Sequence, residues 1–447
     1  MEAKLSGARE AAFSALMSCE KQGAWSDQAI RSAARKWALS ARDAALASNL
    51  CYGVVQNQLL LDFWINAFST TPAVKLNPEV RISLRMALYQ LQFLDRIPAS
   101  AAVNESVGLV RKYTRNKGAA GLTNAVLRSF QRAERPPQPA FADPLQNLSV
   151  RYSHPLPLVR LLSAELGGDV EPLLVADNAP TDMVIQCNTL KTTVIALKDE
   201  LECAGVAVQT HPWLEDCLLV HRSGDLEQLA AFRRGAFYVQ DAAAKLCILA
   251  AAPKPGDRVL DACAAPGGKS FAAALSMENS GSILSRDLHE KKLKRIQSGA
   301  KRLDIDIIST AAADAREFQP ELEDTFDLVI ADVPCSGLGI IRKKPDIRYK
   351  DLRETENLPE IQREILSNLS RYVRPGGTLV YSTCTVLRRE NQAVVANFLS
   401  EHPDYMLEPF ALPGPCGQTA GEITLWPHIH GTDGFFIAKL RRANGEN

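Results

Sequence analysis

The chain has 447 residues, of which 46% are hydrophobic and 23% are charged, and its formal net charge is zero. This length suits about three domains of roughly 150 residues each, and the composition excludes disordered, collagen-like and coiled-coil proteins. The charge is unevenly distributed, because residues 1–140 contain 18 Lys and Arg against 10 Asp and Glu. The first part of the chain is therefore basic and the remainder is acidic.

The sequence has no apolar run near the ~20 residues that a membrane-spanning helix needs. Its first ten residues mix Glu2, Lys4, Arg9 and Glu10 without an apolar signal core. The ten cysteines form no CxxC pair and have no regular spacing, which indicates neither a disulfide framework nor a metal-binding motif. We therefore expect a cytoplasmic protein with reduced thiols, no resident metal and no membrane contact.

Residues 1–140 are predicted to form an all-α domain. From Ala8 to Arg132 the chain is rich in Ala and Leu and apolar at helical intervals, and the prolines at 136–139 then favour an extended linker. Positive charge is densest near the end of this helical bundle, where a polyanion such as nucleic acid would be attracted. On charge alone, a solvated helix face is an equally good interpretation. The residues expected to bind RNA are Arg111, Lys112, Arg115 and Lys117.

Residues 141–237 are predicted to form a small α+β domain, since short alternating strands at 183–187 and 217–220 flank a helical stretch at 194–204. Residues 238–447 alternate strands with helices, which is typical of a mostly parallel, Rossmann-like α/β sheet covered by helices. Two further strands are expected between Ile423 and Leu440. The expected parallel strands lie at 258–262, 282–286, 307–311, 328–331 and 378–382.

The strongest local motif follows the first of these parallel strands. Residues 260–270 read LDACAAPGGKS, so an apolar strand leads into a Gly-Gly turn and then into a helix whose N-terminal amides can bind a ligand. The segment matches neither the dinucleotide-binding fingerprint nor the P-loop, which argues against NAD and ATP. Taken alone, such a motif is more often a plain turn.

Three carboxylates, Asp287, Asp314 and Asp332, lie at or just beyond the ends of later strands. Each alone would be a cap or loop residue. Together they favour a nucleoside-like ligand, because open α/β sheets bind their ligands at the carboxyl ends of the strands. Asp287 has the spacing from the glycine turn that suits ribose hydroxyls.

Cys335 follows the fourth parallel strand and Cys384 follows the fifth. Since adjacent strands lie about 4.8 Å apart, both thiols can reach the same crevice, and we assign them a chemical role. Seven other cysteines are interpreted as small buried hydrophobic residues: Cys19, Cys51, Cys187, Cys203, Cys217, Cys247 and Cys416.

The segments DACAAPGGKS, DVPCSGLG and STCTV together resemble the Sun-type RNA (cytosine-5) methyltransferases, over about residues 238–440. The helical bundle resembles NusB-type RNA-binding domains, mainly through its helical character and basic end. The resemblance implies methylation of RNA, with 16S ribosomal RNA as the expected substrate, by a monomer that uses S-adenosylmethionine. It places the ribose of this cofactor on Asp287 and the adenine near Asp314. The implied cofactor-binding residues are Cys263, Ala264, Ala265, Pro266, Gly267, Gly268, Lys269, Asp287, Asp314 and Asp332.

The resemblance also implies a covalent mechanism. Cytosine C5 is a poor nucleophile, but addition of a thiolate to C6 with protonation of N3 makes C5 enamine-like. Cys384 matches the nucleophile of the family, and Asp332 would hydrogen-bond N3 and the exocyclic amine with a pKa raised by burial. Lys269 would orient Asp332 or lower the pKa of the thiol. Cys335 would assist removal of the C5 proton or release of the product by elimination.

Two alternatives remain. In DNA cytosine-5 methyltransferases the nucleophile lies in the Pro-Cys motif, here Cys335, but only 63 residues follow Cys384 and no large insert separates the two thiols. This arrangement leaves no room for a late target-recognition region and favours RNA. A noncatalytic RNA-binding or ribosome-assembly factor would need none of Lys269, Asp332, Cys335 and Cys384. The sequence also permits action on another RNA.

Overall fold

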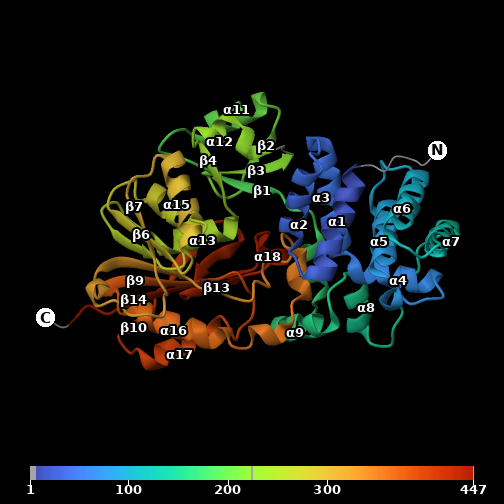
Figure 1. Ribbon diagram of the computed structural model, residues 1–447. Coiled ribbons are helices and arrows are strands. Elements are labelled where there is room, and N and C mark those ends of the chain that lie inside the picture. Colours follow the sequence, from blue (N-terminus) through green and yellow to red (C-terminus); the bar gives the residue numbers. More distant parts are fainter. Residues whose placement is uncertain (1–6, 223–224, 446–447) are drawn as a thin grey trace. The chain divides into compact units, whose positions relative to one another are not determined.

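The computed structural model describes residues 7–222 and 225–445, so Glu2 and Lys4 of the N-terminal segment lie outside it. The chain forms two compact units (Figure 1). One contains Met1–Asn178 and Lys343–Lys350, and the other contains Ala179–Arg342 and Asp351–Asn447. The predicted division at residues 140 and 237 into three domains stays a prediction, and the boundary between the two units falls after Asn178 instead. Among the described residues, no helix is long and apolar enough to cross a membrane.

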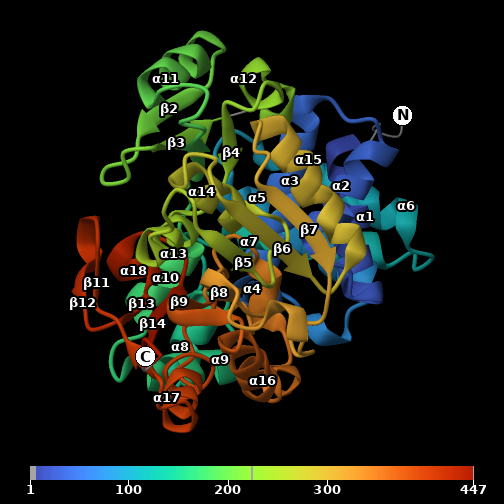
Figure 2. The same cartoon turned by 90° about the vertical axis from the view of Figure 1, so that its left-hand side faces the viewer.

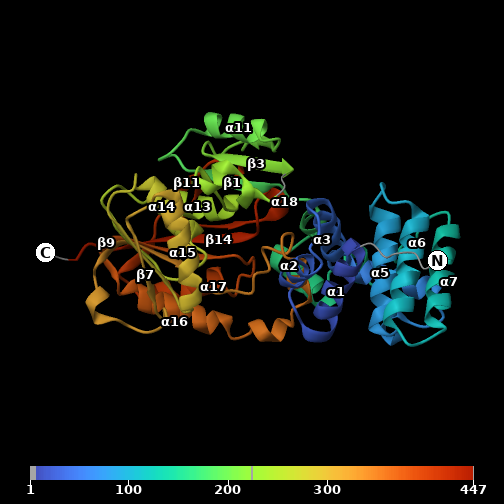
Figure 3. The same cartoon turned by 45° about the horizontal axis from the view of Figure 1, so that its top comes forward.

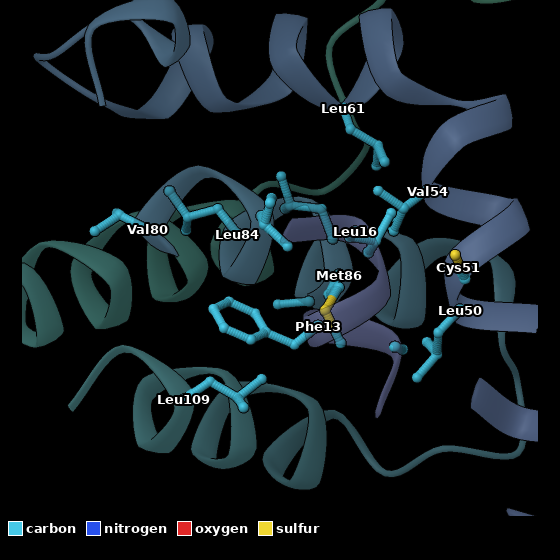
Figure 4. Close-up of a cluster of buried hydrophobic side chains, with 14 of the residues drawn as sticks. Phe13, Leu16, Leu50, Cys51, Val54, Leu61, Val80, Leu84, Met86 and Leu109 are labelled. Atoms are coloured by element: carbon cyan, nitrogen blue, oxygen red, sulfur yellow. The ribbon is translucent and has the colours of Figure 1, made fainter. Parts of the chain in front are cut away.

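The first unit is helical, as the apolar spacing predicts. Side chains such as Leu16, Val54 and Met86 are almost fully buried, and Figure 4 shows them pointing into a common core. Ser40 caps one helix by accepting a hydrogen bond from the Asp43 amide. The helices are α1 (Gly7–Gln22), α2 (Ser26–Lys36), α3 (Ala41–Gln56), α4 (Gln58–Phe68), α5 (Pro78–Phe93), α6 (Ala99–Tyr113), α7 (Ala119–Arg132), α8 (Pro144–Arg151), α9 (Leu156–Leu166) and α10 (Glu171–Asn178), with the short 3-10 helix η1 (Ala73–Lys75) before α5.

A segment from far along the chain completes the first unit. It contains the 3-10 helix η4 (Pro345–Tyr349), whose Arg348 is only 1% exposed. The Arg348 guanidinium donates to the backbone oxygen of Gln56 and to the side-chain oxygen of Asn178, both at 2.9 Å. Asp346 accepts hydrogen bonds from the backbone and hydroxyl of Ser26, the first residue of α2.

The second unit contains a small antiparallel sheet with the strand order β2-β3-β1-β4. Its strands β1 (Met183–Cys187) and β3 (Cys217–Arg222) agree with the predicted positions, and β2 (Ala207–Thr210) and β4 (Phe237–Val239) extend the sheet. The predicted helix is α11 (Val194–Cys203), which packs against this sheet (Figure 3). The 3-10 helix η2 (Leu226–Gln228) and the short helix α12 (Ala230–Arg233) precede β4.

The large sheet of the second unit has the strand order β10-β14-β9-β8-β5-β6-β7, with β13 paired to β14. Strands β5 to β9 are parallel, β14 and β10 are antiparallel, and β5, β6 and β7 run side by side in Figure 2. This is the predicted, mostly parallel α/β sheet. The strands are β5 (Arg258–Asp261), β6 (Ser282–Asp287), β7 (Ile308–Ala312), β8 (Phe326–Asp332), β9 (Val373–Thr383), β10 (Tyr405–Leu407), β13 (Glu422–Leu425) and β14 (Phe435–Arg442).

Helices cover both faces of the large sheet, so its central strands are buried on both sides (Figure 1). One face carries α13 (Ala242–Ala251), α14 (Gly268–Ser276) and α15 (Glu290–Leu303), and the other carries α16 (Leu358–Ser370) and α17 (Gln392–Glu401). The chain order reverses between β5 and β8, which are neighbours in the sheet. Ligands of open α/β sheets bind at such a reversal, beside the carboxyl ends of the strands.

The remaining short elements lie outside these layers. A separate two-stranded sheet pairs β11 (Phe410–Leu412) with β12 (Gly417–Thr419), and the short helix α18 (Pro427–His430) stands between β13 and β14. Three further 3-10 helices lie between or after the strands of the large sheet: η3 (Pro320–Leu322), η5 (Leu352–Thr355) and η6 (Gly414–Cys416).

Candidate active site

The glycine turn of the LDACAAPGGKS motif connects β5 to α14 and has the backbone geometry expected of a ligand-binding loop. Gly267 has a φ of +111°, a backbone angle that residues other than glycine rarely adopt. A Cβ atom at Gly267 would also lie 2.7 Å from the ring of Phe271. The N-terminus of α14 has no side-chain cap, so its first amides remain free to bind a ligand.

Four carboxylates surround this loop. Burial raises the pKa of the Cys263 thiol, and the negative charges of Asp261, Asp332, Asp287 and Asp314 raise it further. The strand ends therefore bring together the three acids that the sequence singled out. They also add Asp261, which was not among the predicted site residues although it ends the apolar strand of the motif.

Asp261 is fully buried, and its Oδ2 accepts a hydrogen bond from Ser270 Oγ at 2.7 Å. Its Oδ1 has no hydrogen-bond partner among the described residues. Burial raises the pKa of Asp261 to about 7. An unsatisfied, buried carboxylate oxygen beside a glycine turn fits a ligand that brings a hydrogen-bond donor or a positive charge.

The two acids predicted to bind a nucleoside differ in their surroundings. Asp287 ends β6, is 7% exposed, and accepts a hydrogen bond from the His289 amide through Oδ1. Asp314 lies two residues beyond β7, and Arg316 donates to both of its carboxylate oxygens. The hydrogen bond from Arg316 lowers the pKa of Asp314. Asp287 thus keeps one oxygen for a ligand, whereas Asp314 already has a strong partner.

Lys269 and Asp332 form an ion pair across the reversal point. Lys269 in α14 donates through Nζ to Asp332 Oδ2 at 2.6 Å, and Ser382 Oγ donates to Asp332 Oδ1 at 2.8 Å. Although burial opposes its charge, the Asp332 carboxylate raises the pKa of Lys269 above its usual range. The two residues, predicted to work together from the sequence, are therefore in direct contact. The protonation state expected of Asp332 stays a prediction.

The two thiols meet at the ends of β8 and β9. Cys335 Sγ and Cys384 Sγ lie 3.2 Å apart, which is within hydrogen-bond distance for sulfur. The hydrogen bond from Cys335 lowers the pKa of Cys384, and the Lys269 charge acts in the same direction. The same hydrogen bond, with burial, raises the pKa of Cys335. The positive charge of Lys269 near Cys384 thus favours a thiolate on Cys384, and the thiolate is the more nucleophilic form of cysteine.

A buried polar cluster behind the thiols was not predicted. Glu390 Oε2 accepts hydrogen bonds from the Ser336 amide at 2.9 Å and from Gln362 Nε2 at 3.0 Å, and Gln362 also donates to the Pro334 oxygen. Asn391 accepts from Thr383 Oγ1 and donates to the oxygen of Thr385. These contacts fix the loops on either side of Cys335 and Cys384. The only sequence signal was a pair of polar residues shortly after STCTV.

The remaining cysteines and possible metal ligands show no comparable arrangement. Cys51, Cys187, Cys217 and Cys247 are buried, as expected for small hydrophobic residues, and Cys19 and Cys416 are partly buried. The expectation was wrong for Cys203, which is exposed because it ends α11 on the outer face of that helix. Within residues 7–222 and 225–445, no group of three His, Cys, Asp or Glu side chains could hold a metal ion.

The four predicted RNA-binding residues lie at the end of α6 and in the loop before α7, and all four are exposed. Lys112 forms an ion pair with Glu10. For Arg111, Arg115 and Lys117 there is no ion pair among the described residues. Their charges are therefore available to an anionic partner.

Comparison with known protein families matches three segments of the chain. Residues 6–132 match the NusB family, and residues 154–227 match the ferredoxin-like domain of RsmF/B-like methyltransferases. Residues 248–441 match the family described as 16S rRNA methyltransferase RsmB/F. The last segment contains the glycine turn and both thiols.

Three relatives extend this similarity. The probable ribosomal RNA small subunit methyltransferase B of Bacillus subtilis (strain 168) is 36% identical over 98% of this chain and 99% of its own length. The crystal structure of PH0851 has a TM-score of 0.80 and 28% identity, covering 99% of this chain and all of that one. NSun6 from Pyrococcus horikoshii, solved with SFG, has a TM-score of 0.55 and covers 64% of this chain and 98% of its own. At 23% identity, NSun6 shows the similarity of fold alone.

Proposed function

The chain belongs to the RsmB/F family of 16S rRNA methyltransferases, and from this premise we propose that it methylates C5 of a cytosine in small-subunit ribosomal RNA through a covalent Cys384 intermediate. The membership confirms the family resemblance drawn from the three motifs. The observation that carries the proposal is the pair of thiols 3.2 Å apart beside the Lys269–Asp332 ion pair. A methyltransferase that acted on an oxygen or an amine would not need this arrangement.

S-adenosylmethionine is the cofactor, as predicted, and supplies an electrophilic methyl group when bound. The residues of the β5–α14 loop suit this molecule. The glycine turn leaves room for close backbone approach, and Asp287 retains an oxygen for the ribose hydroxyls. The unsatisfied Asp261 oxygen suits a ligand that carries positive charge. We propose that residues 263–269 hold the cofactor, with Asp287 on the ribose and Asp314 near the adenine.

The reaction begins with Cys384. Its thiolate adds to C6 of the cytosine and forms an S–C6 bond. The electrons of the C5–C6 double bond shift to form a C4–C5 double bond, and those of the C4–N3 double bond move onto N3. N3 must take up a proton for this addition to proceed. We assign this proton to the Asp332 carboxyl, which in its protonated form donates it to N3. The resulting carboxylate, hydrogen-bonded to Lys269, then accepts from N3 and the exocyclic amine. The ring then has enamine character at C5, and C5 accepts the methyl group.

The product is released when a base removes the proton from C5, N3 returns its proton to the Asp332 carboxylate, and the S–C6 bond breaks, which returns the thiolate to Cys384. We assign Cys335 to this stage, either in removing the proton or in assisting the elimination. Its Sγ lies next to Cys384 Sγ, and its raised pKa makes it a better proton acceptor once it is ionised.

RNA binding is assigned to the basic end of the helical bundle, at Arg111, Lys112, Arg115 and Lys117. We further propose that the protein works as a monomer, since one chain contributes every residue named in these steps. Phosphate contacts by these side chains would hold the RNA without reading its sequence.

The experiment that tests the proposal compares Cys384→Ala with Cys335→Ala. Each variant is incubated with small-subunit rRNA and cofactor, then denatured and run on a gel. Cys384→Ala should lose both methyl transfer and covalent attachment, because no thiolate remains to add to C6. Cys335→Ala should form the bond but release the RNA poorly, so a denaturation-resistant complex of protein and RNA should accumulate.

Cys203→Ala is the matched control, because its exposed thiol lies away from both strand ends and its removal should leave methyl transfer unchanged. If Cys384→Ala traps RNA and Cys335→Ala does not, the nucleophile is Cys335 and the proposed roles are reversed. If wild-type protein produces methylated RNA without 5-methylcytosine, the C5 specificity is wrong.

A further inference from the structure

The two thiols share a hydrogen bond, so the charges around them decide which sulfur ionises first. Around Cys384 lie Cys335, Asp332, Lys269 and Asp433. Lys269 favours a thiolate there, whereas the two carboxylates oppose it. Lys269 is tied to Asp332, so its net influence on Cys384 is reduced. The charge of Lys269 alone therefore does not create a large difference between the pKa values of the two thiols.

The negative charge on the other side comes from Glu390. This side chain is fully buried, and its Oε2 accepts from the amide of Ser336, the residue after Cys335. The other carboxylate oxygen, Oε1, has no hydrogen-bond partner among the described residues. Burial strengthens the effect of a charge on its neighbours, because little water screens it. Cys384, burial and the Glu390 carboxylate all oppose the ionisation of Cys335, and only a hydrogen bond from the Gly337 amide favours it.

We propose that Glu390 is a positioning residue that gives the nucleophilic role to Cys384, because its buried carboxylate holds the Cys335 loop and puts a negative charge beside that thiol. This assignment of Glu390 rests on the proposed function, because it concerns the same two thiols. In this role Glu390 touches neither substrate nor cofactor, and acts only through Cys335.

The hydrogen bonds around Glu390 require an acceptor. The Ser336 amide and Gln362 Nε2 both donate to the same oxygen, Oε2. The Tyr381 hydroxyl donates to the Glu390 backbone oxygen at 2.6 Å, which fixes the start of the segment that carries the side chain. A glutamine at this position would keep an acceptor oxygen of similar shape and remove the charge. Glu390→Gln thus separates the charge from the packing.

The test measures thiol reactivity in the full chain without RNA. Limiting iodoacetamide alkylates the native protein over a pH series, and trypsin then separates the two cysteines. Cys335 falls in residues 317–342 and Cys384 in residues 372–388, each as the only cysteine of its peptide. At pH 7.5 wild-type Cys384 should react at least about tenfold faster than Cys335, the ratio that one pKa unit gives.

Glu390→Gln should reduce this preference by about tenfold, with faster alkylation of Cys335, since one pKa unit is a tenfold change in the thiolate fraction. Glu390→Asp keeps the charge and should stay close to the wild-type ratio. Glu401→Gln makes the same chemical change at an exposed position in α17 and should have no effect.

Equal reactivity of the two thiols in wild-type protein would overturn the proposal, and this measurement needs no substitution to fold. So would an equal change in Glu390→Gln and Glu390→Asp, since packing rather than charge would then explain both. The proposed function fails separately: if Cys384 reacts preferentially with iodoacetamide but Cys335→Ala traps no RNA, the charge arrangement stands and the covalent mechanism does not.

Discussion

At the scale of single residues, Asp287 shows how a strand end prepares a ligand site. Its Oδ1 accepts a hydrogen bond from the His289 amide at 2.9 Å, and Lys292 Nζ lies 3.6 Å from the same oxygen. No described residue donates to Oδ2, although the residue is only 7% exposed. An oriented carboxylate with one unused oxygen is suited to accept the hydroxyls of a ribose.

Asp287→Ala should therefore weaken binding of S-adenosylmethionine by about 10-fold to 100-fold, because hydrogen bonds to a charged group contribute about 1.5–3 kcal/mol. The sheet should remain folded, since the lost hydrogen bond, from the His289 amide to the Asp287 side chain, lies just beyond the end of β6. Calorimetric titration of the cofactor measures the change. Asp306→Ala removes an exposed carboxylate beyond α15 and serves as the control. Unchanged affinity in a folded Asp287→Ala protein would make Asp287 a loop residue without a binding role.

Residues at strand ends could be predicted because the sheet itself determines where they lie. Cys335 and Cys384 follow neighbouring strands, and Lys269 follows the glycine turn, so their convergence needed only the strand order. Glu390 and Gln362 could not be predicted in this way. Their importance depends on hydrogen bonds with segments 54 and 28 residues away along the chain, at Ser336 and Pro334 respectively.

At the scale of elements, the basic residues at the end of α6 and the start of the following loop form one exposed group. Three of the four have no ion pair among the described residues, whereas Lys112 pairs with Glu10. A helix end followed by a short polar loop can present several cations to a phosphate backbone at once. On the alternative interpretation, a solvated helix face, the same cations would contact only water and would bind no anion.

Replacing Arg111, Lys112, Arg115 and Lys117 with Ala should raise the dissociation constant for rRNA and leave cofactor affinity nearly unchanged. The slope of log K against log salt should fall by about 0.7–0.9 for each phosphate that the variant no longer neutralises. Filter binding at several salt concentrations measures both quantities. Replacing Arg35, Lys36, Arg42 and Lys75, which are also exposed, changes the net charge equally. If both sets weaken RNA binding to the same extent, the effect is one of net charge and this surface is not the RNA-binding site.

The elements themselves were predicted with uneven success. The parallel strands were found because strand-like segments alternate with helical ones, although β9 begins at Val373, earlier than the expected residue 378. Its first part contains Pro375 and two glycines, which normally argue against a strand. Pairing with β8 across an irregular register forms it nonetheless. Strands β10, β11 and β12 were missed, since three-residue strands carry no detectable periodicity.

At the scale of the whole molecule, the first unit is not continuous in sequence. Lys343–Lys350 belongs to it, although the residues on either side belong to the second unit. Arg348 reaches backbone oxygens at Gln56 and Ser153, and the Tyr349 hydroxyl donates to the oxygen of Val55 at 3.0 Å. These hydrogen bonds join residues 195 to 294 positions apart. The first unit therefore cannot complete its packing until most of the chain has been synthesised.

Arg348→Ala should destabilise the first unit by about 3 kcal/mol, because several buried acceptors would lose their charged donor. The loss of stability is smaller than it would otherwise be, because two buried guanidinium nitrogens of Arg348, Nε and Nη2, have no hydrogen-bond partner among the described residues, and removing them relieves a desolvation cost. Arg348→Lys should recover only part of the stability, since one ammonium cannot replace a planar fork of donors. Hydrogen exchange of α3 and α10, which end at the Arg348 partners Gln56 and Asn178, measures the change locally.

Arg353→Ala provides the matched comparison. The Arg353 side chain lies three residues beyond the inserted segment, is 82% exposed, pairs with Asp351, and should contribute less than about 0.5 kcal/mol. Faster exchange in α3 and α10 in Arg348→Ala but not in Arg353→Ala would mean that the inserted segment stabilises the first unit through Arg348. Equal exchange in the two variants would mean that the hydrogen bonds of Arg348 only offset the cost of burying it, and that η4 is held mainly by its apolar contacts.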